Sequence, residues 1–182
     1  MHYGENCDNG YMEPHKKTLM VHCDWSTEKE LQFMQKNNIF AAHCSDFNKK
    51  KCFFGVAATR KHLDMNIPVG FGSENAEEDS NSIFRAMVHT IGNSKLYWKW
   101  KDNRVVPLLF SEVFYMTTKG GGAFFGCVGS FEPGYEFDAV VLDDSTLFPL
   151  PLTLAKRVER AVYTSLDENA ITAKYVRGNQ II

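Results

Sequence analysis

The chain has 182 residues, of which 44% are hydrophobic and 23% charged, and a formal net charge of −2 at pH 7. This length supports one packed domain with a small appendage, and the balanced charge argues against nucleic acid as a partner. No apolar run reaches the roughly 18 residues that cross a bilayer, so no membrane partner is expected.

Residues 1–17 show no clear period and are expected to form an irregular segment. Three strand–helix units follow, because short apolar runs alternate with longer segments of helical periodicity. Units of this kind indicate an α/β fold with parallel strands joined by helical crossovers. The expected strands are 18–22, 39–43 and 67–71, and the expected helices are 27–36, 56–65 and 80–100.

Two of these helices carry specific signals. In the first, Thr27 is an N-cap candidate, with Glu30 at the capping-box distance, and Leu31 and Met34 fall on one face. The third helix is expected to bury a single side. Its apolar members are Ile83, Met87, Ile91 and Leu96.

Parallel strands place their carboxyl ends at one edge of the sheet, where ligands bind in such folds. His22, His43 and Glu74 follow the three predicted strands, so each strand delivers a potential metal ligand to that edge. Glu74 also begins the acidic stretch of VGFGSENAEED, residues 69–79. From the residues alone, it is either a ligand or part of a solvated loop and helix start.

The pattern changes after residue 110. Ser111 is expected to cap a helix that ends near Lys119, a β-hairpin is expected within 126–144, and a further helix spans 154–163. A final strand pair, 171–176 and 180–182, turns at Arg177-Gly178-Asn179. The expected organisation is an irregular segment at 1–17, an α/β unit at 18–126 and a small β-rich unit at 127–182.

Seven segments follow one another along the chain: TLMVHCDWSTEKE (18–30), AAHCSDFN (41–48), VGFGSEN (69–75), SNSIFRAM (80–87), FSEVFYMTTKGGGAFFG (110–126), GSFEPGYEFDAVVLDDS (129–145) and AITAKYVRGNQII (170–182). In this order they resemble the metal-dependent amidohydrolase superfamily, and most closely the C-terminal portion of the guanine deaminases. The resemblance covers residue 18 to the end. It implies that residues 18–126 are part of a (β/α)8 barrel, its last strands in about three strand–helix units, and that the tail is the C-terminal share of a small β-sandwich.

The resemblance also implies roles for three residues. His22 matches a metal-binding histidine, His43 matches a histidine that lines the substrate site, and Glu74 stands where the family has a catalytic, metal-binding aspartate. The family's metal is usually zinc, which activates the water that converts guanine to xanthine. The His-x-His pair and the fifth-strand histidine of the family have no counterpart in this sequence.

Two interpretations follow. The first is a guanine deaminase-like enzyme of purine metabolism, truncated and with impaired or no activity alone, because a catalytic zinc needs about three protein ligands. It would act with a second copy or with a complementing N-terminal fragment. The alternative is a non-catalytic interaction or oligomerisation module.

The odd number of cysteines and the lack of a signal peptide predict reduced thiols in the cytoplasm.

Overall fold

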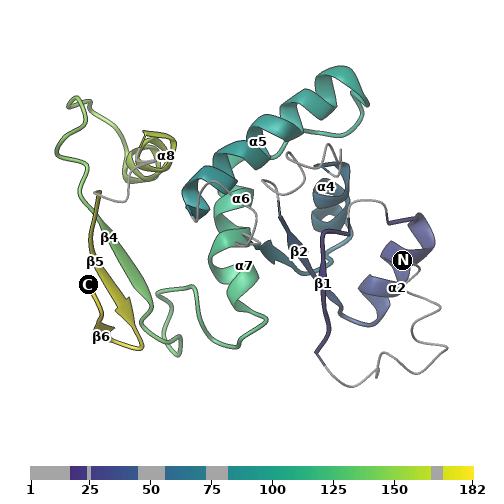
Figure 1. The fold of residues 1–182 in the computed structure, drawn as a ribbon, viewed down its shortest axis with the longest axis horizontal. Coiled ribbons are helices and arrows are strands. Elements are labelled where there is room, and N and C mark those ends of the chain that lie inside the picture. Colours follow the sequence, from purple (N-terminus) through teal and green to yellow (C-terminus); the bar gives the residue numbers. More distant parts are fainter. Residues whose placement is uncertain (1–16, 24–25, 45–55, 73–81, 165–169) are drawn as a thin grey trace.

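The computed structural model describes residues 17–23, 26–44, 56–72, 82–164 and 170–182 (Figure 1). The described residues form two separate three-stranded sheets with helices around them.

The first sheet is parallel and has the strand order β1-β2-β3, as the alternation of strands and helices predicts. Helix α2 follows β1 and helix α4 follows β2 in the chain. The elements are β1 (Leu19–Val21), α2 (Glu28–Lys36), β2 (Phe40–His43), α4 (Val56–Asp64) and β3 (Val69–Phe71).

The start of α2 confirms the predicted capping box. The Thr27 amide donates to Glu30 Oε2 at 2.7 Å, and the Glu30 amide donates to Thr27 Oγ1 at 3.3 Å. These bonds satisfy two amides that have no partner inside the helix. Leu31 and Met34 are both buried, so the predicted apolar face is confirmed as well.

The strand register assigns residues to the two faces of the parallel sheet. Ala41 pairs with Val69, and His43 pairs with Phe71, so these side chains share one face, which we call the outer face. Leu31 and Met34 of α2 pack in the core that includes Ala41 and Val69. The outer face is therefore the face against which α2 packs.

The opposite, inner face carries Ala42 and Gly70, which are also register partners. Helix α7 (Lys119–Gly122) lies against it, because a Cβ on Gly70 would stand 2.9 Å from the Gly121 Cα atom. The absence of side chains at these two glycines is what permits this close approach. Further along the inner face, the Phe40 ring meets the Phe124 ring edge to face at 5.2 Å.

Helix α5 (Ile83–Trp100) buries Met87 and Ile91 in a cluster against which Phe71 of β3 packs. The prediction that Leu96 shares this face is wrong, since Leu96 is 58% exposed. The physical reason is helical geometry: Leu96 lies five positions after Ile91, which rotates it by about 140° around the axis. Ser94, three positions after Ile91, is buried instead.

Helix α6 (Phe110–Thr117) begins one residue before Ser111, so the prediction that Ser111 caps it is wrong. Glu112 serves the helix start instead, because its Oε2 atom accepts the Leu109 amide at 2.8 Å. The same carboxylate receives both terminal nitrogens of Arg60, at 2.9 and 2.6 Å. This two-point ion pair ties α4 to α6.

The second sheet is antiparallel and joins β4 (Ala139–Leu142), β5 (Ile171–Val176) and β6 (Asn179–Gln180). The final strand pair is confirmed, and its turn has positive φ at Arg177 and Gly178. The predicted hairpin within 126–144 is wrong, because β4 pairs with β5. The Tyr135 amide does bond to the Glu132 carbonyl, so the turn there forms without a strand before it among the described residues.

Helix α8 (Leu154–Thr164) matches the predicted helix and packs against α5 (Figure 1). Val162 joins Met87 and Ile91 in one buried cluster. A residue of the predicted β-rich unit therefore contributes to the core of the helical layer. The division of the chain at residue 127 stays a prediction.

The Arg60–Glu112 pair predicts a measurable contribution to stability. Glu112→Gln should lower the free energy of unfolding by about 1–2 kcal/mol, because it removes the charge opposite a largely buried guanidinium and weakens the α6 cap. Urea denaturation measures the change. Asp102→Asn is the matched control. It breaks a pair whose arginine, Arg104, is well exposed, and should therefore lower the free energy of unfolding by less than Glu112→Gln does. Equal losses in the two variants would contradict the prediction.

Candidate active site

The carboxyl ends of β1 and β2 bring His22 and His43 to the same edge of the parallel sheet. The His22 amide donates to the Ala42 carbonyl at 2.9 Å, which continues the ladder one residue past β1. The Gly72 amide donates to the His43 carbonyl at 3.0 Å on the other side. The three strand ends are therefore held in register at this edge.

The chain turns sharply at the end of β1. His22 and Cys23 have φ angles of 70° and 56°, in the left-handed region that non-glycine residues seldom adopt. Cys23 is buried, and its thiol lies 3.5 Å from the Met20 carbonyl, while the Ser26 hydroxyl donates to the Cys23 carbonyl. Two successive strained residues at a strand end are typical of a functional site.

His43 lies on the outer face, enclosed by side chains of α4, α5 and β3. Thr59 Oγ1 is 3.1 Å from His43 Nδ1, and Thr90 Oγ1 is 3.2 Å from His43 Nε2. The Phe71 ring packs edge to face on the imidazole at 5.6 Å. A neutral imidazole has one donor and one acceptor nitrogen, and the two hydroxyls satisfy both.

Burial keeps two histidines of this region uncharged. It lowers the pKa of His43 to about 4, and the neighbouring His62 and His22 add to the effect. Burial also lowers the pKa of His62, on α4, to about 4. His62 Nε2 is buried and has no hydrogen-bond partner. Protonation of either ring would place an imidazolium charge in the buried interior, away from water.

The third strand end approaches β2 closely. A Cβ on Gly72 would lie 2.9 Å from Cys44 Sγ, so glycine allows the chain to leave β3 beside the buried Cys44. Glu74, predicted as catalytic and metal-binding, lies outside the described residues. The convergence of His22, His43 and Glu74 on one pocket therefore stays a prediction.

The partners of His43 leave no local signal in the sequence. Thr59 and His62 are three positions apart on α4, which places them on one helical face, but nothing local connects them to His43. Thr90 is 47 residues from His43 in the chain. Only the packing of α4 and α5 on the sheet brings these groups together.

The described residues do not form a complete metal site. No group of three or more histidine, cysteine, aspartate or glutamate side chains among them is placed to hold an ion. The zinc that the amidohydrolase resemblance implies is thus not accommodated by this part of the chain alone.

A three-stranded parallel sheet with helical crossovers and histidines at its carboxyl edge defines an α/β fold. The profile of the Amidohydrolase family matches residues 1–181. The chain belongs to the amidohydrolase family.

Curated relatives of the chain include several guanine deaminases. The enzyme of Dictyostelium discoideum is 27% identical over 176 residues, which cover 91% of this chain and 38% of that protein. The Homo sapiens guanine deaminase is 27% identical over 180 residues, with the same two shares. This chain thus spans well under half the length of the relatives it matches.

Solved structures extend the similarity to three dimensions. Guanine deaminase from C. acetobutylicum, with guanine bound in its active site, is 38% identical, with a TM-score of 0.86 over 99% of this chain and 42% of that one. An adenosine deaminase from Xanthomonas campestris with bound zinc is 19% identical, with a TM-score of 0.75 over 97% of this chain and 39% of that one. Because its sequence identity is only 19%, the similarity to this second structure is evidence for the shared fold alone.

The two lowered pKa values predict an acid-sensitive fold. Unfolded histidines have pKa values near 6.5, so the unfolded chain binds more protons between about pH 6.5 and 4. The stability is fully present above pH 6.5 and should fall as the pH drops to about 4, on the order of 2 kcal/mol per histidine. Urea denaturation between pH 7 and 4.5 measures this fall.

Two variants assign the effect to these residues. His62→Leu should keep the stability at pH 7, since it removes a buried nitrogen without a partner, and should reduce the pH dependence. His43→Leu should also reduce the pH dependence but lower the stability at pH 7, because the buried Thr59 and Thr90 hydroxyls lose their partner. A His62→Leu protein that retains the full pH dependence would refute the assignment.

Glycine substitutions at the two residues of the strained turn should change the free energy of unfolding by different amounts. His22→Gly should change the free energy of unfolding by less than about 0.5 kcal/mol, because relief of the left-handed strain offsets the added freedom of the unfolded chain. Cys23→Gly relieves similar strain but should lower stability by about 1–2 kcal/mol, since it empties a buried position. Thermal or urea unfolding measures both changes. Equal losses of unfolding free energy in the two variants would contradict the prediction and would mean that the His22 side chain stabilises the fold.

Proposed function

We propose that this chain is the C-terminal part of a guanine deaminase-like hydrolase that converts guanine to xanthine and ammonia. The similarity to the C. acetobutylicum guanine deaminase carries the proposal, because it combines 38% identity with a TM-score of 0.86 over nearly the whole chain. The curated guanine deaminases support the same activity over 91% of the chain.

The strand-end residues are proposed to serve this activity. His22 is proposed as a metal ligand, because it stands on a strained turn at the carboxyl edge, where ligands bind in sheets of this type. Glu74, which follows β3 in the sequence, is proposed as a metal ligand and as the acceptor of a proton from the attacking water. Its carboxylate is one methylene longer than the aspartate of the family, so its reach differs.

His43 is proposed to act on the substrate side of the site. Both of its nitrogens lie within hydrogen-bond distance of threonines, so direct contact with a purine would require one of these bonds to be exchanged. The geometry favours a positioning role, in which His43 anchors the end of β2 beside His22.

Zinc is the proposed metal, because solved relatives with this fold contain it, among them the X. campestris enzyme and a TrzN chlorohydrolase variant complexed with zinc. The described residues do not supply a full ligand set. The missing ligands are proposed to come from the barrel strands that the relatives have and this chain does not match.

The parallel sheet offers a surface on which such strands can add. Strands β1 and β3 are its two edges, and Leu19 and Val21 on β1 are exposed. Exposed apolar strand edges are sites where further strands pair. We propose that a complementing N-terminal amidohydrolase segment, or a second copy of the chain, covers this edge.

An assay of xanthine formation from guanine with added zinc tests the proposal. The chain alone should show little activity and less than one zinc per chain. Mixing it with the part of C. acetobutylicum guanine deaminase that it does not match should restore both, and His22→Ala should remove the restored activity.

Glu74→Asp in the restored complex should raise the rate about 10- to 100-fold, because it brings the carboxylate to the distance that the family uses. Glu77→Asp, three positions further on, is the matched control and should leave the rate unchanged. A complex that forms but binds no zinc and makes no xanthine would favour the non-catalytic interaction module.

A further inference from the structure

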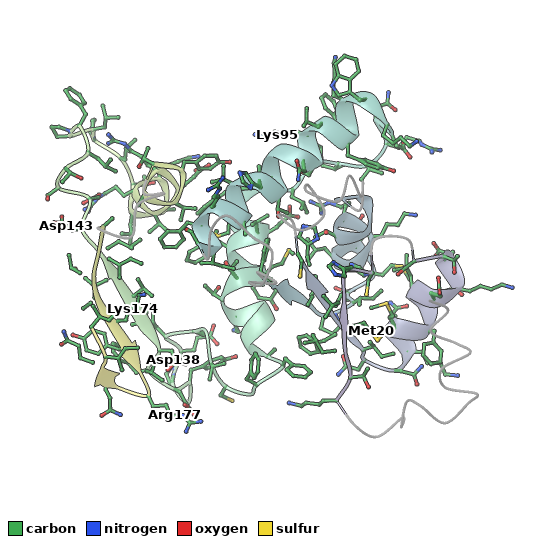
Figure 2. The ribbon with its side chains drawn as sticks, viewed as in Figure 1. Met20, Lys95, Asp138, Asp143, Lys174 and Arg177 are labelled. Atoms are coloured by element: carbon green, nitrogen blue, oxygen red, sulfur yellow. The ribbon has the colours of Figure 1, made fainter. Side chains whose placement is uncertain are left out.

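The C-terminal end of α5 carries apolar side chains that no part of the described core covers. Leu96 is 58%, Trp98 41% and Trp100 80% exposed. Trp100 lies nine positions after the buried Ile91, on the opposite side of the helix by about 180°. In Figure 1 this end of α5 extends beyond the other helices, and the sticks in Figure 2 project from it into open space around Lys95.

The same helix end is basic. Lys95, Lys99 and Lys101 are all exposed and alternate with the apolar residues in the sequence KLYWKWK, residues 95–101. We call these three lysines, with Leu96, Trp98 and Trp100, the α5 end surface.

The acidic residue that follows this surface in the chain is already paired. Asp102, the first acidic residue after the helix, is held by the Arg104 guanidinium at 2.8 Å. Lys61 of α4 also acts on Asp102, and both cations hold the pKa of that carboxyl at about 2. Asp102 is thus ionised and bound at neutral pH, and the lysines leave the α5 end surface with a net positive charge.

We propose that the α5 end surface binds the surface of an anionic lipid bilayer. Tryptophan prefers the interfacial layer of a membrane, where its ring is buried and its N–H stays near the headgroups. Leucine adds apolar area, and lysines beside such residues attract acidic headgroups. The combination on one protruding helix end fits this partner.

Other occupants fit less well. A second copy docking through the same surface would place its lysines against these lysines, because a two-fold contact brings identical patches together. Strands that complete the barrel would add at the edges of the sheet, while Leu96 and Trp100 lie on the side of α5 that faces away from it. A nucleic acid would gain stacking from the tryptophans but nothing from Leu96.

The proposed contact is peripheral. None of the described helices is long and apolar enough to cross a membrane. The expectation of no membrane partner rests on the lack of long apolar runs, and a short amphipathic surface can bind a bilayer without such a run. The inference is independent of the deaminase activity.

Vesicle binding tests the proposal on the intact chain. The protein should co-sediment with vesicles of phosphatidylcholine and phosphatidylserine in a 70:30 ratio at about 0.1 M salt, and bind pure phosphatidylcholine at least tenfold more weakly. Two of the chain's three tryptophans belong to this surface, so their fluorescence should shift to the blue on binding.

Matched variants locate the contact. Trp100→Ala and the double variant Lys95→Gln/Lys99→Gln should each weaken binding about tenfold or more. Phe125→Ala removes an aromatic ring that is 79% exposed elsewhere, and Lys29→Gln/Lys36→Gln removes two exposed lysines of α2; both should bind as the parent does. All substituted side chains are exposed, and circular dichroism checks that the variants remain folded.

Three results would overturn the proposal. The first is no binding to the acidic vesicles, and the second is equal loss in the α5 variants and their controls. The third is binding of a single-stranded oligonucleotide, sensitive to the α5 variants, by a protein that ignores the vesicles.

Discussion

The parallel register of β1, β2 and β3 is the constraint on which the candidate site depends. It pairs Val21 with Ala42, and Ala42 with Gly70, and so aligns the carboxyl ends of the strands. His22 and His43 are neighbours in space for this reason, although they lie 21 positions apart in the chain. A shift of one residue in either pairing would move His43 to the opposite face and break its contacts with Thr59 and Thr90.

The two histidines have different surroundings, which suits different tasks. His43 is enclosed, hydrogen-bonded at both nitrogens and uncharged at neutral pH. His22 stands on a strained turn just past its strand, where the chain leaves the sheet. The buried residue can hold the geometry of the edge, while the proposal that His22 binds a metal draws on its strained turn.

The remaining elements hold this edge from outside. Helix α7 approaches the inner face through Gly70 and Gly121, and the Arg60–Glu112 pair connects α4 with α6. Val162 of α8 packs with Met87 and Ile91 of α5, so the C-terminal region supports the helical layer. The far end of α5 takes no part in this packing, and its lysines and tryptophans are free to serve a separate purpose.

The sequence by itself determined the local elements, because their signals are short-range: the Thr27–Glu30 cap, the apolar strand runs and the turn at Arg177-Gly178. It also placed His22 and His43 at strand ends, since chain order decides where a strand stops. Tertiary structure decided what no local pattern encodes. The β5 partner of β4 lies about thirty residues further along the chain, the threonines of His43 come from two helices, and Leu96 faces solvent. Long-range pairing and burial depend on how the helices pack on the sheet, and a single sequence carries no direct record of that packing.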